Sequence, residues 1–392
     1  MRLAVTLAIA VTGNVGMWSV IAVLPEVAQE FGASRSLASL PYTLTMLGFA
    51  LGNLVIGGWV DRFGISRVLA LSGATLSLAY WGAAQAGSIW ALAAVQFVIG
   101  FATSASFGPL VADLSLWFLR RRGIAVAIAA SGNYLAGAIW PVALGYLNPE
   151  SSWRWDYATL GVATLLVVVP LSTLLRARVP DEALAAAETA RAARARSTGF
   201  TPRQLMWLLG IAGIGCCVAM SMPQVHIVAL CVDLGYGPVA GAEMLSVMLL
   251  GGVVSRILSG MIADVLGGLR TLLLGSVLQM LALFLYLPAQ GLTSLYLVSL
   301  VFGLAQGGII PSYAVIVREY LPAREAGRRV GFVIMMTILG MALGGWMSGW
   351  IYDVSGSYAL AFWNGIAFNA LNIAVMLTIL TRSRRAGGPL PA

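Results

Sequence analysis

The chain has 392 residues, of which 59% are hydrophobic and only 10% are charged, and its mean hydropathy is +0.89. This composition excludes an ordinary soluble globular domain, in which about 25% of residues are charged. The formal net charge of +8 comes from 23 arginines without a single lysine. A basic balance would suggest nucleic acid in a soluble protein. In a chain this apolar, the positions of the arginines are explained by membrane topology, because basic residues accumulate in cytoplasmic loops. We therefore expect no nucleic-acid partner.

Twelve apolar segments follow one another along the chain, each close to the roughly 20 residues that a helix needs to cross a bilayer. They span residues 3–24, 37–60, 68–86, 89–110, 124–147, 157–175, 204–229, 244–263, 271–287, 292–317, 330–351 and 358–380. The sequence therefore predicts an all-α integral membrane protein with twelve transmembrane helices.

One long hydrophilic stretch divides these segments into six and six. We expect a six-helix bundle over residues 1–176, a cytoplasmic linker over 177–202 and a second six-helix bundle over 203–392. Twenty of the 23 arginines fall in the linker, near the chain ends or in connections on the same side of the predicted membrane. The positive-inside rule then puts both termini in the cytoplasm. We expect a multi-pass protein of a bacterial inner membrane.

A pattern of Gly, Asp, Gly and Arg occurs twice at the same spacing. It consists of Gly57, Asp61, Gly64 and Arg67 in the first half and of Gly260, Asp264, Gly267 and Arg270 in the second. Corresponding residues are 203 positions apart (260 − 57), and each copy straddles the end of a long apolar segment. This repeat indicates two parallel copies of one six-helix unit, and so two pseudo-symmetric bundles, an architecture typical of carriers.

The duplicated turns, the six-plus-six helices and the central linker resemble the major facilitator superfamily over the whole chain. In that superfamily the Asp and the basic residues of such a turn bond across the cytoplasmic gate in the outward-open state. The resemblance implies a gating role for Asp61, Arg62, Arg67, Asp264 and Arg270. It also implies a transporter without a cofactor and without enzymatic activity. The alternative is that these charges only fix topology at helix ends.

Three short stretches are similar to the monocarboxylate transporter and oxalate:formate antiporter group. They are the aromatic, Arg-rich loop 117–125 that leads to Ser131 and Gly132, the Ser-Trp-Arg-Trp turn 152–155, and segment 255–260 on the eighth span. In that group the Arg of the third stretch, Arg256 here, engages the substrate carboxylate. The resemblance implies a secondary active transporter of a small organic anion, most simply a monocarboxylate.

The chemistry of Arg256 supports this interpretation independently. It lies eight residues before Asp264, or about 12 Å along a helix, in a hydrocarbon layer of about 30 Å. An arginine at that depth is costly unless it faces a partner or an aqueous cavity, so it marks a candidate functional site. Its guanidinium can hold a carboxylate through two parallel hydrogen bonds and stays charged at physiological pH. Gly252 and Gly260, one turn to either side, predict open space for a small ligand. A structural ion pair is the alternative.

The chain departs from the pattern of that group in two places. The group commonly has an Asp one turn before the Arg, where it takes part in proton coupling, and Gly252 stands there. The oxalate carrier adds a Lys on its eleventh helix, whereas this chain has no Lys and its eleventh span, 330–351, carries no charge. One fixed cation favours a monoanion, and the missing Asp argues against proton symport by that route.

Other polar residues within the spans are candidates for the binding cavity. We expect Asn14, Asn133, Tyr134 and Tyr313 to contact the substrate, although each could instead support packing between helices. His226, the single histidine, can carry a proton near neutral pH and is the candidate for proton coupling. A histidine satisfied by structural hydrogen bonds is the alternative and has the stronger prior.

Two competing functions belong to other classes of protein. An exporter of drugs or amphiphilic metabolites by proton antiport would share the fold, but it usually has an acidic residue in the cavity and a Gly-x-x-x-Gly-Pro motif in helix five. The chain has a loose version of that motif, Gly132, Gly137 and Pro141. An intramembrane enzyme or receptor is disfavoured, because no metal-ligand cluster or nucleophile triad is present in the sequence.

We expect a monomer, with the carboxylate substrate, membrane lipids and, for a coupled carrier, protons as partners.

Overall fold

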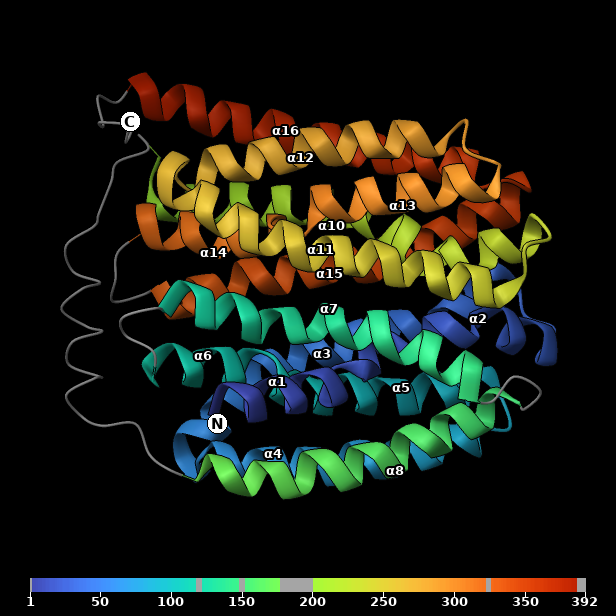
Figure 1. The fold of residues 1–392 in the computed structure, drawn as a ribbon. Coiled ribbons are helices and arrows are strands. Elements are labelled where there is room, and N and C mark those ends of the chain that lie inside the picture. The colour runs from blue at the N-terminus through green and yellow to red at the C-terminus, as the bar shows by residue number, and fades with distance from the viewer. Residues whose placement is uncertain (1, 118–121, 148–151, 177–199, 322–325, 386–392) are drawn as a thin grey trace.

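The computed structural model describes residues 2–117, 122–147, 152–176, 200–321 and 326–385 (Figure 1). Every regular element in these ranges is a helix, as a bilayer requires of a chain that must satisfy its backbone hydrogen bonds internally. Residues 118–121 of the Arg-rich loop and 177–199 of the expected linker lie outside the described residues.

The first half contains α1 (Arg2–Gly13), α2 (Ser19–Glu30), α3 (Arg35–Phe63), α4 (Ile65–Ala84), α5 (Ile89–Thr103), α6 (Gly108–Trp117), α7 (Arg122–Leu147) and α8 (Trp153–Ser172). The second half contains α10 (Pro202–Asp233), α11 (Gly237–Leu266), α12 (Gly268–Tyr286), α13 (Leu292–Gln306), α14 (Ile309–Tyr320), α15 (Ala326–Ser355) and α16 (Ala359–Arg385).

In the described part of the chain, eleven helical segments are long and apolar enough to cross a membrane. The twelfth span is α4, whose hydropathy is lowered by Arg67 and three serines. The prediction of an all-α membrane protein with twelve spanning helices is confirmed.

Among the described spans three are interrupted, a feature that the hydropathy of the sequence does not predict. The first span breaks at Asn14, between the end of α1 and a 3-10 turn that precedes α2. A 3-10 turn at Ser104–Ser106 separates α5 from α6, and Gly307 and Gly308 separate α13 from α14. The last two breaks are related by the repeat, because Ser104 corresponds to Gly307 (307 − 203). Interrupted helices leave backbone groups free for side chains and ligands.

The 203-residue repeat also holds in the backbone geometry. A Cβ added to Gly100 on α5 would lie 1.9 Å from the carbonyl oxygen of Thr45 on α3. A Cβ on Gly303 of α13 would lie 1.9 Å from the carbonyl oxygen of Met248 on α11, and both members of the pair are shifted by 203. Glycine at these positions lets two helix backbones touch.

Figure 1 shows the two halves side by side, with α1–α8 below and α10–α16 above. Contacts between them run chiefly through α3 against α15 and α7 against α11. We call the end where α1 begins and where Gly64 and Gly267 form their turns the terminal face. The other end, which carries the α2–α3 and α10–α11 turns, is the opposite face.

Direct contacts join the halves at the opposite face. The guanidinium of Arg35, at the start of α3, pairs with Asp233 at the end of α10. The backbone N–H groups of Arg35 and Ser36 donate to the two carboxylate oxygens of Asp353 on α15, at 2.7 and 2.8 Å. Close by, a Cβ on Gly349 would lie 2.7 Å from the carbonyl oxygen of Arg35. The two halves are therefore joined at the opposite face.

The terminal face is different. Asp61 and Asp264 are exposed there, and among the described residues neither forms an ion pair. A Cβ added to Gly57, Gly58 or Gly260 would meet no atom within 4 Å. Within the described ranges, the two duplicated turns therefore form no ion pair across the terminal face.

Gly303→Ala should lower the thermal unfolding midpoint of the purified protein, because its methyl group would collide with the Met248 carbonyl and push α11 and α13 apart. Overpacking of this kind costs about 1–3 kcal/mol, or a few degrees. Gly58→Ala is the control, since open space surrounds that position and its midpoint should hold or rise slightly. Equal midpoints for the two variants would contradict the backbone contact.

Candidate functional site

Arg256 on α11 is buried between the two halves, with 5% of its surface exposed. Its Nη1 donates to the carbonyl oxygen of Ala130 on α7 at 2.5 Å, and its Nε donates to the carbonyl oxygen of Gly307 at 3.2 Å. Ala130 belongs to the first half, whereas Gly307 lies in the break between α13 and α14. Among the described residues no carboxylate forms an ion pair with Arg256. The alternative to ligand binding, a structural ion pair, therefore has no carboxylate partner among the described residues.

Tyr134 on α7 covers the guanidinium. The Cζ atom of Arg256 lies 4.1 Å from the centre of the Tyr134 ring, in a cation–π contact. The ring fills the space beside Gly252, where a Cβ would lie 2.7 Å from Tyr134 Cε2. The predicted open space beside Gly252 is therefore wrong, because an aromatic side chain of the other half occupies it. The space beside Gly260 is open as predicted.

Trp18, which precedes α2, holds the adjoining turn of α7. Its Nε1 donates to the backbone oxygen of Asn133 at 2.9 Å and to Asn133 Oδ1 at 3.0 Å. Its ring meets Tyr134 edge-on, with centroids 6.2 Å apart. The side-chain oxygen of Asn133 is thus engaged by Trp18, and a role for Asn133 in substrate contact stays a prediction. Sequence reasoning missed this contact, because Trp18 is brought inward by the break in the first span.

Asn14 lies at that break and joins two interrupted spans. Its Nδ2 donates to the carbonyl oxygens of Ala10 and Ser106, both at 2.8 Å. The residue is fully buried, and among the described residues its Oδ1 has no hydrogen-bond partner. Asn14 therefore braces the first half and keeps one unused acceptor.

A buried amide pair lies next to the break that holds Arg256. Gln224 Nε2 on α10 donates to Gln306 Oε1 on α13 at 2.8 Å, and both side chains are fully buried. The other two amide atoms, Gln224 Oε1 and Gln306 Nε2, have no partner in the part of the chain that the structure describes. Gln306 directly precedes Gly307. This pair was not predictable from the sequence, because its two members are 82 residues apart and lie on different helices.

Tyr313 and His226 are held by partners within the second half. The Tyr313 hydroxyl donates to Asn372 Oδ1 on α16 at 3.0 Å. His226 Nε2 lies 2.8 Å from the carbonyl oxygen of Gly345, and its Nδ1 lies 3.2 Å from the Tyr358 hydroxyl. Because a carbonyl can only accept, Nε2 carries the hydrogen in this arrangement. Roles for Tyr313 in substrate contact and for His226 in proton coupling stay predictions.

The residues of the two charged turns occupy equivalent places at the terminal face. Asp61 and Arg62 lie on the last turn of α3, and Asp264 lies on the last turn of α11. Arg67 and Arg270 lie on the first turns of α4 and α12. Their gating role stays a prediction.

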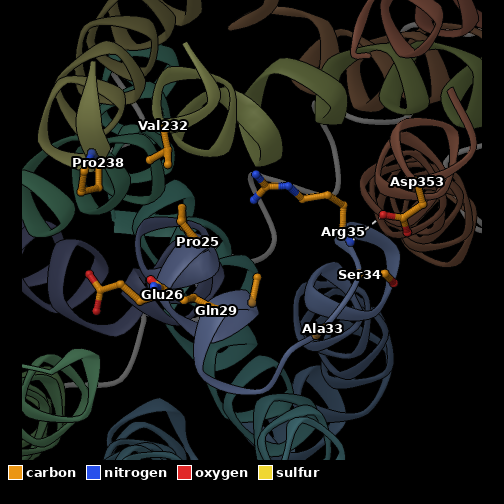
Figure 2. Close-up of a pocket in the computed structure, with 10 residues that line it drawn as sticks. Pro25, Glu26, Gln29, Ala33, Ser34, Arg35, Val232, Pro238 and Asp353 are labelled. Atoms are coloured by element: carbon orange, nitrogen blue, oxygen red, sulfur yellow. Dashed lines mark hydrogen bonds between the residues drawn. The ribbon is translucent and has the colours of Figure 1, made fainter. Parts of the chain in front are cut away.

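A hollow of about 530 Å³ opens at the opposite face, lined by residues of α2, the α2–α3 turn, α10, α11 and α15. Figure 2 shows the side chain of Arg35 extending into it, with the backbone of Arg35 bonded to Asp353. Arg256 does not line this hollow. Within the described ranges no group of three or more His, Cys, Asp and Glu could hold a metal ion.

Known proteins resemble this chain in sequence and in fold. Monocarboxylate transporter 13 of Bos taurus is 25% identical over 346 residues, which cover 88% of this chain and 79% of that one. The efflux pump FUB11 of Gibberella fujikuroi is 30% identical over 144 residues, or 36% of this chain and 25% of the pump. A bacterial homologue of the human lysosomal transporter Spinster, solved in an inward-facing and occupied conformation, superposes with a TM-score of 0.73 at 14% identity, covering 100% of this chain and 98% of that one.

A family model described as the Major Facilitator Superfamily matches residues 6–302 and 232–392. The match covers more than half of the chain, and it agrees with the twelve spans and the internal repeat. The chain therefore belongs to the major facilitator superfamily.

Proposed function

We propose that the protein is a secondary active transporter of a small monocarboxylate, that it works by alternating access, and that Arg256 binds the carboxylate. The observation that carries the proposal is the setting of the guanidinium. It is buried between the halves against the neutral carbonyl oxygens of Ala130 and Gly307, and it has no carboxylate partner among the described residues. A buried cation without a counter-ion is a site that an anion stabilises.

Binding at this position would change the contact between the halves. A carboxylate is a stronger acceptor for a guanidinium than a carbonyl oxygen, because both partners are then charged. An incoming carboxylate can therefore replace the Ala130 carbonyl as the partner of Nη1. Since Ala130 belongs to the first half and Arg256 to the second, this exchange releases one link between them and biases their relative position.

The charge inventory favours a monoanion. Among the described residues, Arg256 is the only Asp, Glu, Lys or Arg whose side chain is buried. A second carboxylate of a dianion would lie in the same low-dielectric region without a cation, at a cost of several kcal/mol. The best substrate class is therefore an acid with a single carboxylate.

Orientation and gating follow from the arginines. We take the terminal face as cytoplasmic, since 20 of 23 arginines lie in ends and connections on that side. The present conformation is then closed to the outside. In the alternate state, we infer, Asp61 and Asp264 with Arg62, Arg67 and Arg270 bond across the cytoplasmic side.

Relatives support two substrate classes. The relative named monocarboxylate transporter 13 matches along most of both chains, which favours the carboxylate. The efflux pump matches at higher identity over 36% of the chain, which keeps proton-driven export of amphiphilic metabolites as the second candidate. His226 is the candidate proton carrier for either function, because Gly252 stands where carboxylate carriers place an Asp.

Small monocarboxylates such as acetate, propionate and butyrate should raise the unfolding midpoint of the purified protein, and Arg256→Gln should remove this effect. Glutamine keeps a hydrogen-bond donor but loses the charge, so the affinity should fall at least tenfold. Thermal-shift titration measures both. Arg154→Gln is the matched control, because Arg154 pairs with Glu30 at the opposite face and its variant should keep the ligand response. Stabilisation that survives Arg256→Gln, or that only amphiphilic cations produce, would favour the exporter.

Asp61→Asn should lower the transport rate several-fold in proteoliposomes while leaving substrate affinity within a few-fold of the wild type. The change removes a charge needed to close the cytoplasmic side and leaves the binding site intact. Initial rates over a range of substrate concentrations separate the two parameters. An unchanged maximal rate would eliminate the gating role and leave the turn as a topology signal.

A further inference from the structure

The repeat relates Arg256 to one residue of the first half. Position 256 corresponds to position 53 (256 − 203), which is Asn53 on α3. The relation is structural as well as numerical, because α3 spans Arg35–Phe63 and α11 spans Gly237–Leu266, and each is followed by a glycine with positive φ. An uncharged polar residue thus occupies, in one half, the position that the buried cation occupies in the other.

On α11 this position ends a stripe that faces the first half. Leu245, Leu249, Gly252 and Arg256 follow one another at steps of four, three and four residues, so they lie on one side of the helix. All four are buried. The stripe faces α7, because Gly252 lies against the ring of Tyr134.

On α3 the equivalent stripe faces the second half. Tyr42, Met46, Phe49 and Asn53 follow the same steps, and the first three are buried in one core cluster with residues of α10, α11 and α15. Tyr42 lies against α15, where a Cβ on Gly345 would come within 2.8 Å of the Tyr42 ring. Asn53 is the next position of this stripe toward the terminal face, and it is partly exposed.

The surroundings of Asn53 repeat those of Arg256 in one further respect. Each side chain lies at, or directly beside, the break in the neighbouring interrupted span. Arg256 Nε donates to the carbonyl of Gly307, and Asn53 Oδ1 lies 3.0 Å from the place of a Cβ on Gly108, the first residue of α6. Asn53 Nδ2 donates to the Phe49 carbonyl of its own helix at 2.8 Å, and no described residue donates a hydrogen bond to its Oδ1.

We propose that Asn53 is the contact of the first half with the substrate and the residue that restricts the carrier to monocarboxylates. The inference rests on the proposed function, since it names the residue that contacts the end of the substrate that Arg256 does not hold. When the halves close around the ligand, the two stripes bring Arg256 and Asn53 to it from opposite sides. An amide can donate to or accept from a neutral group, but it supplies no charge for a second carboxylate.

A change of one residue tests this assignment with propionate and malonate, which have three carbons each and differ in one carboxylate. Asn53→Arg should raise the affinity for malonate at least tenfold over the wild type, because the second carboxylate then gains a guanidinium. Asn53→Met removes the amide without adding charge, so it should weaken propionate binding several-fold and gain nothing with malonate. Titration calorimetry or thermal shift on the purified full-length variants measures each affinity.

The double variant Arg256→Gln with Asn53→Arg moves the cation from one stripe to the other. It should recover propionate binding that Arg256→Gln alone loses. If Arg256→Gln keeps propionate binding, the proposed function fails. If Arg256→Gln loses it, while Asn53→Arg gains no malonate affinity and the double variant recovers nothing, the assignment of Asn53 alone is overturned.

A cysteine at position 53 provides a readout that does not depend on tolerating a new charge. Asn53→Cys should react with a membrane-impermeant thiol reagent, and propionate should slow the reaction at least threefold. Phe63→Cys is the control, because Phe63 is 49% exposed at the end of α3 on the terminal face and propionate should not affect its labelling. The native Cys216, Cys217 and Cys231 are buried, so the unmodified chain gives the background. No labelling at position 53, or labelling that propionate leaves unchanged in a protein that still binds it, would overturn the assignment.

Discussion

The structure depends on holding one guanidinium buried between the two halves without a counter-ion among the described residues. Desolvating an ion is among the largest costs a membrane protein faces. Here Arg256 is held by backbone oxygens and an aromatic face: the Ala130 and Gly307 carbonyls and the Tyr134 ring. The Gly307 carbonyl lies at the break in the tenth span, and the Ala130 carbonyl belongs to the other half. The interruption of that helix and the close contact of α7 with α11 both serve the same charge.

Duplication supplied the scaffold, whereas the chemistry of the two halves diverged. Backbone contacts and the charged turns recur at the same spacing in both halves, but the polar side chains around the site do not. Asn14 corresponds to Cys217 (217 − 203), and Tyr134 corresponds to Thr337 (337 − 203). In each pair one residue offers stronger hydrogen-bonding or aromatic character than the other. Under the proposed function, this difference between the halves fits an asymmetric ligand, charged at one end and neutral at the other.

Hydropathy was enough to predict the spans, because a bilayer core tolerates only helices whose backbone is satisfied internally. Arg256 was also predictable, since its charge contrasts with everything around it. The environment of that charge was not, because it depends on side chains that come from distant helices. Gly252 indicated empty space, but the Tyr134 ring fills it. Nothing in the sequence around Gln306 predicts its hydrogen bond with Gln224, 82 residues away. Breaks in the helices escaped prediction because glycine and small polar residues are common throughout these spans.

The contact of Asp353 with the start of α3 has a consequence for the energetics of opening. The first N–H groups of a helix have no partner within the helix, and those of Arg35 and Ser36 are satisfied by a carboxylate from the other half of the molecule. Asp353 therefore caps the N-terminus of α3 from the other half of the molecule. The N–H groups of Arg35 and Ser36 keep this partner only while the two halves are in contact at the opposite face. Capping interactions are worth about 0.5–2 kcal/mol, and water can take the place of the carboxylate when the halves part. An interaction of that strength favours contact at this face by roughly tenfold and still breaks on thermal motion, as the alternating access proposed above requires.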